Sequence, residues 1–304
     1  EANKRYATTK SRLANLKNTA TLFAQQIGDD LNPTIQALID KGNELLASFL
    51  GLDESQRMSI IRFAGMAAAV GAFTALLHIS APYGRHLRRG WGPLIRNLHG
   101  WVIMEAPAAL LFAALFAIGG APRTLPIWLF LTLWELHYVH RAFIYPLTIR
   151  DGRKKMPIAV VLLGFGFNVG NAYVNGRYLF SLSGGYPQGW VRDPRFVIGL
   201  VLFVAGYIAN RWSDLILRGL RQPGETGYRI PYGGLFRWVS CPNYLGEIVE
   251  WFGWALATWS LPGLAFAVWT FANLAPRARA HHAWYHANFP SYPSERKALI
   301  PGIW

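Results

Sequence analysis

Seven apolar runs, each long enough to cross a lipid bilayer, follow one another along this 304-residue chain. A helix needs about 20 mainly apolar residues to cross the hydrocarbon core of a membrane. Charged residues make up only 15% of the chain, against about 25% in an average soluble domain. The sequence therefore predicts an all-α integral membrane protein with seven transmembrane helices, at about 60–80, 101–120, 125–146, 157–175, 196–217, 238–258 and 260–278.

The basic residues of the loops predict the orientation of these spans, because Lys and Arg accumulate on the cytoplasmic side. The loop at 81–100 has four arginines, whereas the next loop has only Arg123. The loops after the third and fifth spans and the C-terminal tail are also basic, and the tight turn predicted at 260–263 has no Lys or Arg. The loop after the fourth span, with three arginines, fits the alternation least well. The pattern places the N-terminus outside and the C-terminus in the cytoplasm.

The N-terminal segment differs in character from the rest of the chain. Residues 1–57 are polar and carry no net charge, whereas the whole formal charge of +14 falls in residues 58–304. The chain begins at Glu1, and Met58, followed directly by an apolar run, resembles a natural start. We expect residues 1–57 to be a soluble helical segment from an expression fusion, or else a native N-terminal extension. Residues 58–304 are expected to form the seven-helix membrane domain.

Charge distribution and cysteine content narrow the classes of ligand. The single cysteine, Cys241, excludes a disulfide framework and a Cys-rich metal site. The positive charge is divided among several loops and forms no single basic stripe, so nucleic acid is not an expected partner. Two explanations for the basic loops stay open: the bias of membrane topology alone, or a pocket for a polyanionic cofactor.

Polar and ionisable side chains occur in or at the ends of six of the seven runs, where such groups are costly and often functional. They are Glu105, Glu135, His137, Tyr138, His140, Arg141, Asn168, Asn171, Asn210, Arg211, Asp214, Asn243, Glu247, Glu250, Arg277, Arg279, His281, His282, Tyr285 and His286. Helical residues four apart share one face. This spacing relates Asn210 to Asp214, Asn243 to Glu247, and His281 to Tyr285. We therefore predict an internal polar cavity in which these pairs converge on one polar ligand.

Two other patterns have simpler explanations than a cofactor or metal site. Gly164, Gly166 and Gly170 are spaced as in a dinucleotide-binding fingerprint, but that motif needs a preceding strand in a soluble βαβ unit. Inside an apolar run, close helix packing explains these glycines better. The chain has eight histidines, and a membrane di-iron site would need nearly all of them, scattered loop residues included. We therefore expect no metal site.

The C-terminal part of the chain carries a resemblance to a known family. The loop from Arg218 to Pro231 reads RGLRQPGETGYRIP, residues 243–251 read NYLGEIVEW, and residues 296–301 read RKALIP. Weaker matches continue upstream, so that together they cover 83–304. This sequence closely resembles the steroid 5α-reductases.

The resemblance implies a seven-helix membrane enzyme that reduces the Δ4 double bond of 3-oxo-Δ4-steroids to 5α-dihydro steroids by hydride transfer from NADPH. It implies that Glu105 and Tyr138 bind and polarise the C3 carbonyl of the substrate. The cofactor-binding positions that it implies are Asn171, Asn210, Asp214, Arg221, Tyr228, Arg229, Asn243, Glu247, His281 and Tyr285. The hydrophobic, steroid-like substrate is expected to enter from the lipid bilayer, in a bacterial inner membrane or, in a eukaryote, the endoplasmic reticulum membrane.

The residue types suit these roles. Reduction of a conjugated enone develops enolate charge on the carbonyl oxygen, and donors aimed at that oxygen stabilise the transition state. Tyr138 can donate its phenolic proton, and Glu105 can donate when its carboxyl is protonated. Arg221 and Arg229 are always charged and suit bidentate contact with phosphate. Met104 departs from the family pattern, which has Gln before the carbonyl-binding Glu, and its side chain cannot donate a hydrogen bond.

Other functions stay open on the sequence alone. A related membrane reductase of trans-2-enoyl-CoA or polyprenal would share the fold and the hydride donor. A membrane methyltransferase of the isoprenylcysteine type has a loosely similar C-terminal layout and would bind S-adenosylmethionine in place of NADPH. A sterol sensor or transporter would not need the pair formed by Glu105 and Tyr138. Binding of NADPH would distinguish a reductase from a methyltransferase and from a sterol sensor or transporter.

Overall fold

The computed structural model describes residues 90–149, 155–220, 225 and 227–304, together with scattered positions between 40 and 87. Arg221 and most of the first predicted span lie outside the described residues. The chain divides into two compact units, Glu1–Ile61 and Arg62–Trp304. The helices and strands described below all belong to the second unit.

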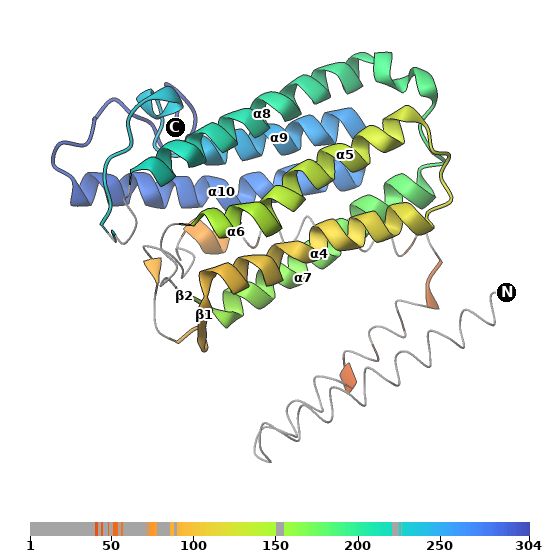
Figure 1. Ribbon diagram of the computed structural model, residues 1–304, viewed down its shortest axis with the longest axis horizontal. Coiled ribbons are helices and arrows are strands. Elements are labelled where there is room, and N and C mark those ends of the chain that lie inside the picture. Colours follow the sequence, from red (N-terminus) through yellow and green to blue (C-terminus); the bar gives the residue numbers. More distant parts are fainter. Residues whose placement is uncertain are drawn as a thin grey trace. The chain divides into compact units, whose positions relative to one another are not determined.

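Long helices make up most of the second unit (Figure 1). The elements are β1 (Leu94–Arg96), α4 (Asn97–Ile118), α5 (Leu125–Val139), the π-helical turn η2 (His140–Ile144), α6 (Tyr145–Thr148), β2 (Lys155–Pro157), α7 (Ile158–Arg177), the π-helical turn η3 (Tyr178–Leu182), the 3-10 turn η4 (Gln188–Arg192), α8 (Pro194–Gly219), the 3-10 turn η5 (Gly234–Arg237), α9 (Pro242–Thr258) and α10 (Leu261–Asn288). The second to seventh predicted spans each coincide with one helix or a continuous helical stretch. The largest difference is in α10, which ends at Asn288 rather than at 278.

Three of the described helical segments are long and apolar enough to cross a membrane: Asn97–Ile118, Ile158–Leu182 and Pro194–Gly219. By contrast, α9 has 17 residues, short of the roughly 20 that a span needs. α5 has 15 residues but continues without a break through η2 and α6 to Thr148. These findings support a helical membrane protein. The number of seven spans and their orientation stay predictions.

A small sheet holds the beginnings of α4 and α7 together, since β1 pairs antiparallel with β2 and each helix follows its strand directly. The predicted close packing is found at Gly164 of α7, where an added Cβ would lie 2.3 Å from Cγ of Met104 on α4. At Gly166 and Gly170 no described atom lies within 4 Å of an added Cβ, so close packing at these two positions stays a prediction. Gly164 therefore lies directly against the segment of α4 that carries Glu105.

Glycines seven residues apart bring α8 and α9 into backbone contact. An added Cβ at Gly206 of α8 would lie 2.3 Å from the backbone nitrogen of Glu250, and one at Gly246 of α9 would lie 2.5 Å from that of Asn210. Gly199 and Gly253 repeat these contacts one heptad away. Small residues allow such close approach of helices in membranes. This packing fixes the polar ends of α8 and α9 side by side.

Aromatic side chains fill the centre of the helix bundle. Phe112, Trp134, Trp251 and Trp254 are all buried, and the Phe112 and Trp134 rings stack with centroids 4.3 Å apart. Aromatic pairs of this kind contribute about 0.5–1.5 kcal/mol beyond the area that they bury. Because Trp251 also contacts His137 and Tyr138, this core holds the polar residues beside it.

The turn between α9 and α10 comprises residues 259–260, so it begins one residue before the predicted turn at 260–263 and ends three residues before it. Trp259 has a left-handed backbone (φ 44°) after the end of α9, and the Ser260 side chain caps α10 by accepting a hydrogen bond from the Gly263 nitrogen at 3.1 Å. Ser is a preferred N-cap residue, and Pro262 fits the first turn that follows. Residues 261–263 therefore begin α10.

Candidate functional site

A cavity of about 260 Å³ lies among α4, α5, η2, α7, α9 and α10. Its lining has an apolar part, to which Phe167, Phe266 and Trp269 belong, and a polar part. The polar and charged lining residues are Glu105, His137, Tyr138, Arg141, Asn168, Glu247, Thr270, Asn273 and Arg277. The predicted carbonyl-binding pair and one predicted cofactor residue thus line one cavity. Met104, the departure from the family pattern, lines it as well.

Glu105 is held by an amide from the neighbouring helix. Its side chain is buried, and Oε2 accepts a hydrogen bond from Nδ2 of Asn168 at 3.0 Å. The same Nδ2 lies 2.8 Å from the backbone oxygen of Met104. The other carboxyl oxygen, Oε1, lies 3.7 Å from Nε of Arg141. These contacts fix the orientation of the carboxyl group at the cavity wall.

Tyr138 keeps its phenolic proton available to the cavity. Nδ2 of Asn171 lies 3.4 Å from the Tyr138 oxygen, and an amide nitrogen can only donate. Asn171 in turn accepts a hydrogen bond from Asn175, whose oxygen accepts one from Trp254. Asn171 was predicted as a cofactor residue, but in this structure it contacts the predicted carbonyl-binding tyrosine.

Two of the three predicted polar pairs meet between α8 and α9. Nδ2 of Asn210 lies 2.8 Å from the backbone oxygen of Asn243 and 3.3 Å from Oε2 of Glu247. Nδ2 of Asn243 lies 3.2 Å from Oδ1 of Asp214. The structure therefore brings these four residues together, and their convergence on one polar ligand stays a prediction.

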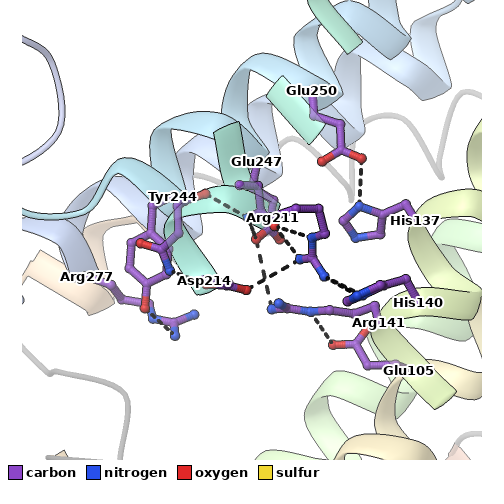
Figure 2. A network of polar contacts seen from close by, with 12 residues as sticks. Glu105, His137, His140, Arg141, Arg211, Asp214, Tyr244, Glu247, Glu250 and Arg277 are labelled. Atoms are coloured by element: carbon purple, nitrogen blue, oxygen red, sulfur yellow. Dashed lines mark hydrogen bonds and ion pairs between the residues drawn. The ribbon is translucent and has the colours of Figure 1, made fainter. Parts of the chain in front are cut away.

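Arg141 joins this cluster to Glu105, as Figure 2 shows. Its Nη2 lies 4.0 Å from Oε2 of Glu247, while its guanidinium stands 4.6 Å from the Trp101 ring centroid. Arg141 lies in the π-helical turn η2, and such turns within helices are frequent at functional sites. A second arginine, Arg211, hydrogen-bonds Asn210 and His140 and lies 3.5 Å from Asp214. Two arginines and three carboxylates therefore form one network.

The third predicted pair, His281 and Tyr285, lies on α10, outside the interface between α8 and α9. Nε2 of His281 lies 3.2 Å from the hydroxyl of Tyr244, next to Asn243 in the chain, and this hydroxyl also accepts from Arg277. Tyr285 is buried and stacks on Tyr292 of the C-terminal segment, with centroids 5.0 Å apart. His281 is therefore linked to the α9 residues through Tyr244, whereas the ring of Tyr285 stacks on the C-terminal segment.

The remaining predicted cofactor residues belong to the segment between α8 and α9. The Tyr228 ring contacts Trp284 of α10, with centroids 5.0 Å apart. Arg229 is exposed and pairs with Glu225 at 2.9 Å. Arg221 lies outside the described residues. These contacts join Tyr228 to α10 and Arg229 to its own segment.

Several residues of the site had no role in the sequence prediction. Asn168 holds Glu105, Arg141 joins the two carboxylate groups, and His137 makes a 2.7 Å contact with the fully buried Glu250. The sequence marks these four residues only as polar groups inside apolar runs, and that pattern is the signal that could have identified them. Within the described part of the chain, no three His, Cys, Asp or Glu side chains are grouped as metal ligands.

Comparison with known proteins gives consistent matches. The family model described as 3-oxo-5-alpha-steroid 4-dehydrogenase matches residues 154–304. The 3-oxo-5-alpha-steroid 4-dehydrogenase 1 of Bos taurus is 41% identical over 254 residues, which are 82% of this chain and 98% of the relative. Steroid 5-alpha-reductase DET2 of Arabidopsis thaliana is 42% identical over 80% of this chain and 93% of its own length. The 3-oxo-5-alpha-steroid 4-dehydrogenase 2 of Homo sapiens is 43% identical over 79% and 95%.

Proposed function

Because this chain belongs to the steroid 5α-reductase family, we propose that it reduces the Δ4 double bond of 3-oxo-Δ4-steroids with NADPH. The enzyme is an oxidoreductase acting on CH–CH groups. The observation that carries the proposal is the cavity in which Glu105 and Tyr138 stand together at an apolar wall. That cavity offers donors for one carbonyl oxygen and an apolar surface for a steroid skeleton.

The carbonyl-binding step follows from the contacts of these two residues. Asn171 donates to the Tyr138 oxygen, so the phenolic proton points elsewhere and can bind a substrate carbonyl. Oε2 of Glu105 accepts from Asn168, and Oε1, which lies 3.7 Å from Nε of Arg141, can carry a proton toward the same carbonyl. Both donors then stabilise the negative charge that develops on the oxygen, beside the buried aromatic core.

The network between α8 and α9 fits a nicotinamide dinucleotide. Its amides and carboxylates, from Asn210, Asp214, Asn243 and Glu247, suit ribose hydroxyls and a carboxamide, because they include both donors and acceptors. The arginines nearby suit phosphates, since a guanidinium matches phosphate geometry. When bound, NADPH supplies the hydride for the β-carbon of the enone. We assign Arg221, Tyr228, Arg229, His281 and Tyr285 to the same cofactor on the sequence resemblance.

We also propose that the substrate reaches the cavity from the bilayer. The apolar helices α4, α7 and α8 support a membrane location, and a steroid partitions into lipid because it is mostly hydrocarbon. An orientation with the C-terminus in the cytoplasm gives the polar network access to a water-soluble cofactor. The inner membrane is the expected location in a bacterium, and the endoplasmic reticulum membrane in a eukaryote.

The proposal is tested by anaerobic turnover of the purified, detergent-solubilised chain with NADPH and progesterone or testosterone. We expect a 5α-dihydro product, identified by mass and stereochemistry, that is lost in Glu105→Ala and retained by the exposed control Glu295→Gln. Binding of NADPH without turnover of either steroid would reject the steroid substrate and favour trans-2-enoyl-CoA or polyprenal. An intact protein that binds no NADPH would reject the reductase function and favour the methyltransferase.

A further inference from the structure

The carboxyl group of Glu250, in α9, is fully buried, although only one of its two oxygens has a hydrogen-bond partner among the described residues. Glu250 is 0% exposed, and its Oε1 lies 2.7 Å from Nδ1 of His137. Within the described residues, its other oxygen, Oε2, has no hydrogen-bond partner. A buried unsatisfied oxygen costs about 1–3 kcal/mol, and in a native structure such a group calls for an explanation.

The other end of this contact faces the proposed active site. His137 lines the cavity, and it directly precedes Tyr138 in α5. Figure 2 shows its imidazole between the Glu250 carboxyl and the rest of the network. Trp251 and Tyr138 hold the ring edge-on, with centroids 4.7 Å and 5.0 Å away. In the part of the chain that the structure describes, Glu250 is the hydrogen-bond partner of this ring, and no other is found for Nε2.

The proposed reduction needs a proton at a second place on the substrate. Hydride addition to the β-carbon leaves an enolate, and its α-carbon must take a proton before the ketone is complete. Glu105 and Tyr138 are engaged with the carbonyl oxygen, two bonds away from that carbon. A separate donor at the cavity wall is therefore needed, or the enol must leave the enzyme unprotonated at carbon.

We propose that His137 and Glu250 form a proton relay that protonates the α-carbon of the enolate. The inference rests on the proposed function. In the resting state Glu250 is protonated and donates to Nδ1, and the proton of the neutral imidazole is on Nε2. The imidazole gives its Nε2 proton to the α-carbon and takes the Glu250 proton at Nδ1.

This step balances in charge and atoms. The enolate electron pair forms the new C–H bond as the carbonyl double bond is restored, so the anionic enolate becomes a neutral ketone. His137 remains neutral in its other tautomer, and Glu250 becomes a carboxylate. A proton from water restores the pair before the next turnover. Because a histidine has two distinct ring nitrogens, it can accept at one while it donates at the other.

The test is reduction of testosterone with NADPH in deuterium oxide by the full-length enzyme, with the α-carbon label resolved by NMR. A donor in the site delivers deuterium to one face, whereas an enol released into solvent takes it on both. We expect one labelled epimer from the wild type and a mixture from His137→Gln and from Glu250→Gln. General acid catalysis contributes about 10²–10⁴-fold, so ketone formation should slow about 100-fold while single-turnover oxidation of NADPH continues.

The controls separate this inference from the proposed function. His99→Gln and Glu295→Gln change exposed residues outside the cavity and should give the wild-type epimer. A single epimer at the wild-type rate from either relay variant would overturn the relay and leave the reductase intact. A wild type that reduces no steroid would overturn both. Because Glu250→Gln keeps a hydrogen bond to the ring, it decides the question if His137→Gln does not fold.

Discussion

Replacing Gly206 by Ala should separate the helices that carry the polar network. An added Cβ would lie 2.3 Å from the Glu250 nitrogen and 2.5 Å from the Gly246 oxygen, whereas ordinary contact begins at 3.4 Å. Both neighbours are backbone atoms, so no side chain can rotate away. The helices must move apart by about 1 Å, and overpacking of this kind costs about 1–3 kcal/mol.

The same displacement should weaken cofactor binding. Asn210 lies 2.8 Å from the Asn243 oxygen and 3.3 Å from Glu247 across this interface. An extra separation of about 1 Å carries both contacts beyond hydrogen-bond range. We therefore expect a lower affinity for NADPH together with the loss of stability.

Thermal unfolding of the solubilised protein is the assay, with Gly166→Ala as the matched control. At about 2–4 °C per kcal/mol, Gly206→Ala should lower Tm by about 2–12 °C. Gly166 is in the interior of α7, where no described atom lies within 4 Å of an added Cβ. There alanine should stabilise the helix by up to about 1 kcal/mol. A Gly206→Ala protein as stable as Gly166→Ala would refute the assignment of close backbone packing.

Three further substitutions test separate contacts. Asn168→Ala removes the donor to Glu105, at a cost of about 1–3 kcal/mol, so steroid turnover should fall about tenfold or more while NADPH titration shows unchanged affinity. Ser240→Ala removes a hydroxyl that lies 2.6 Å from that of Tyr292 and should lower Tm, with no change in the product formed. Asp193 has a pKa lowered to about 2 by hydrogen bonds from the arginine two residues on, and its carboxylate caps α8. The Tm advantage of wild type over Asp193→Asn should therefore be complete above its ordinary pKa of 3.8 and vanish as the pH falls through about 2.

Local patterns in the sequence predict the part of the site that depends on single helices. The spacing of Asn210 with Asp214 and of Asn243 with Glu247 fixes which side chains share a face. It does not fix which faces meet. That second condition comes from glycines seven residues apart in α8 and α9, a pattern that composition and hydropathy do not reveal. The sequence therefore identifies both pairs, and the helix interface explains why they converge.

Irregular backbone and long-range contacts account for what the sequence does not predict. Arg141 belongs to the π-helical turn η2, and hydrophobic periodicity assumes a regular helix of 3.6 residues per turn. Periodicity therefore does not predict that Arg141 lies between the carboxylates of Glu105 and Glu247. The ring of Tyr285 stacks on that of Tyr292, a residue beyond the end of α10. The i,i+4 spacing of Tyr285 from His281 does not predict this contact.

The charges of the network bear on the state of Glu105. Arg141 lies 3.7 Å from Glu105 and 4.0 Å from Glu247, so one guanidinium is shared by two carboxyl groups. Arg211 is engaged with Asp214 and does not relieve this imbalance. A buried charge without a partner is strongly destabilising. Arg141 and Arg211 balance Glu247 and Asp214 in charge, so these four groups with Glu105 are neutral if Glu105 holds a proton. That proton is the one needed to bind a carbonyl oxygen.

Glu105→Gln, which keeps an N–H donor without the charge, should therefore retain more steroid turnover than Glu105→Ala. Complete loss in Glu105→Gln with full activity in Tyr138→Phe would contradict a protonated Glu105.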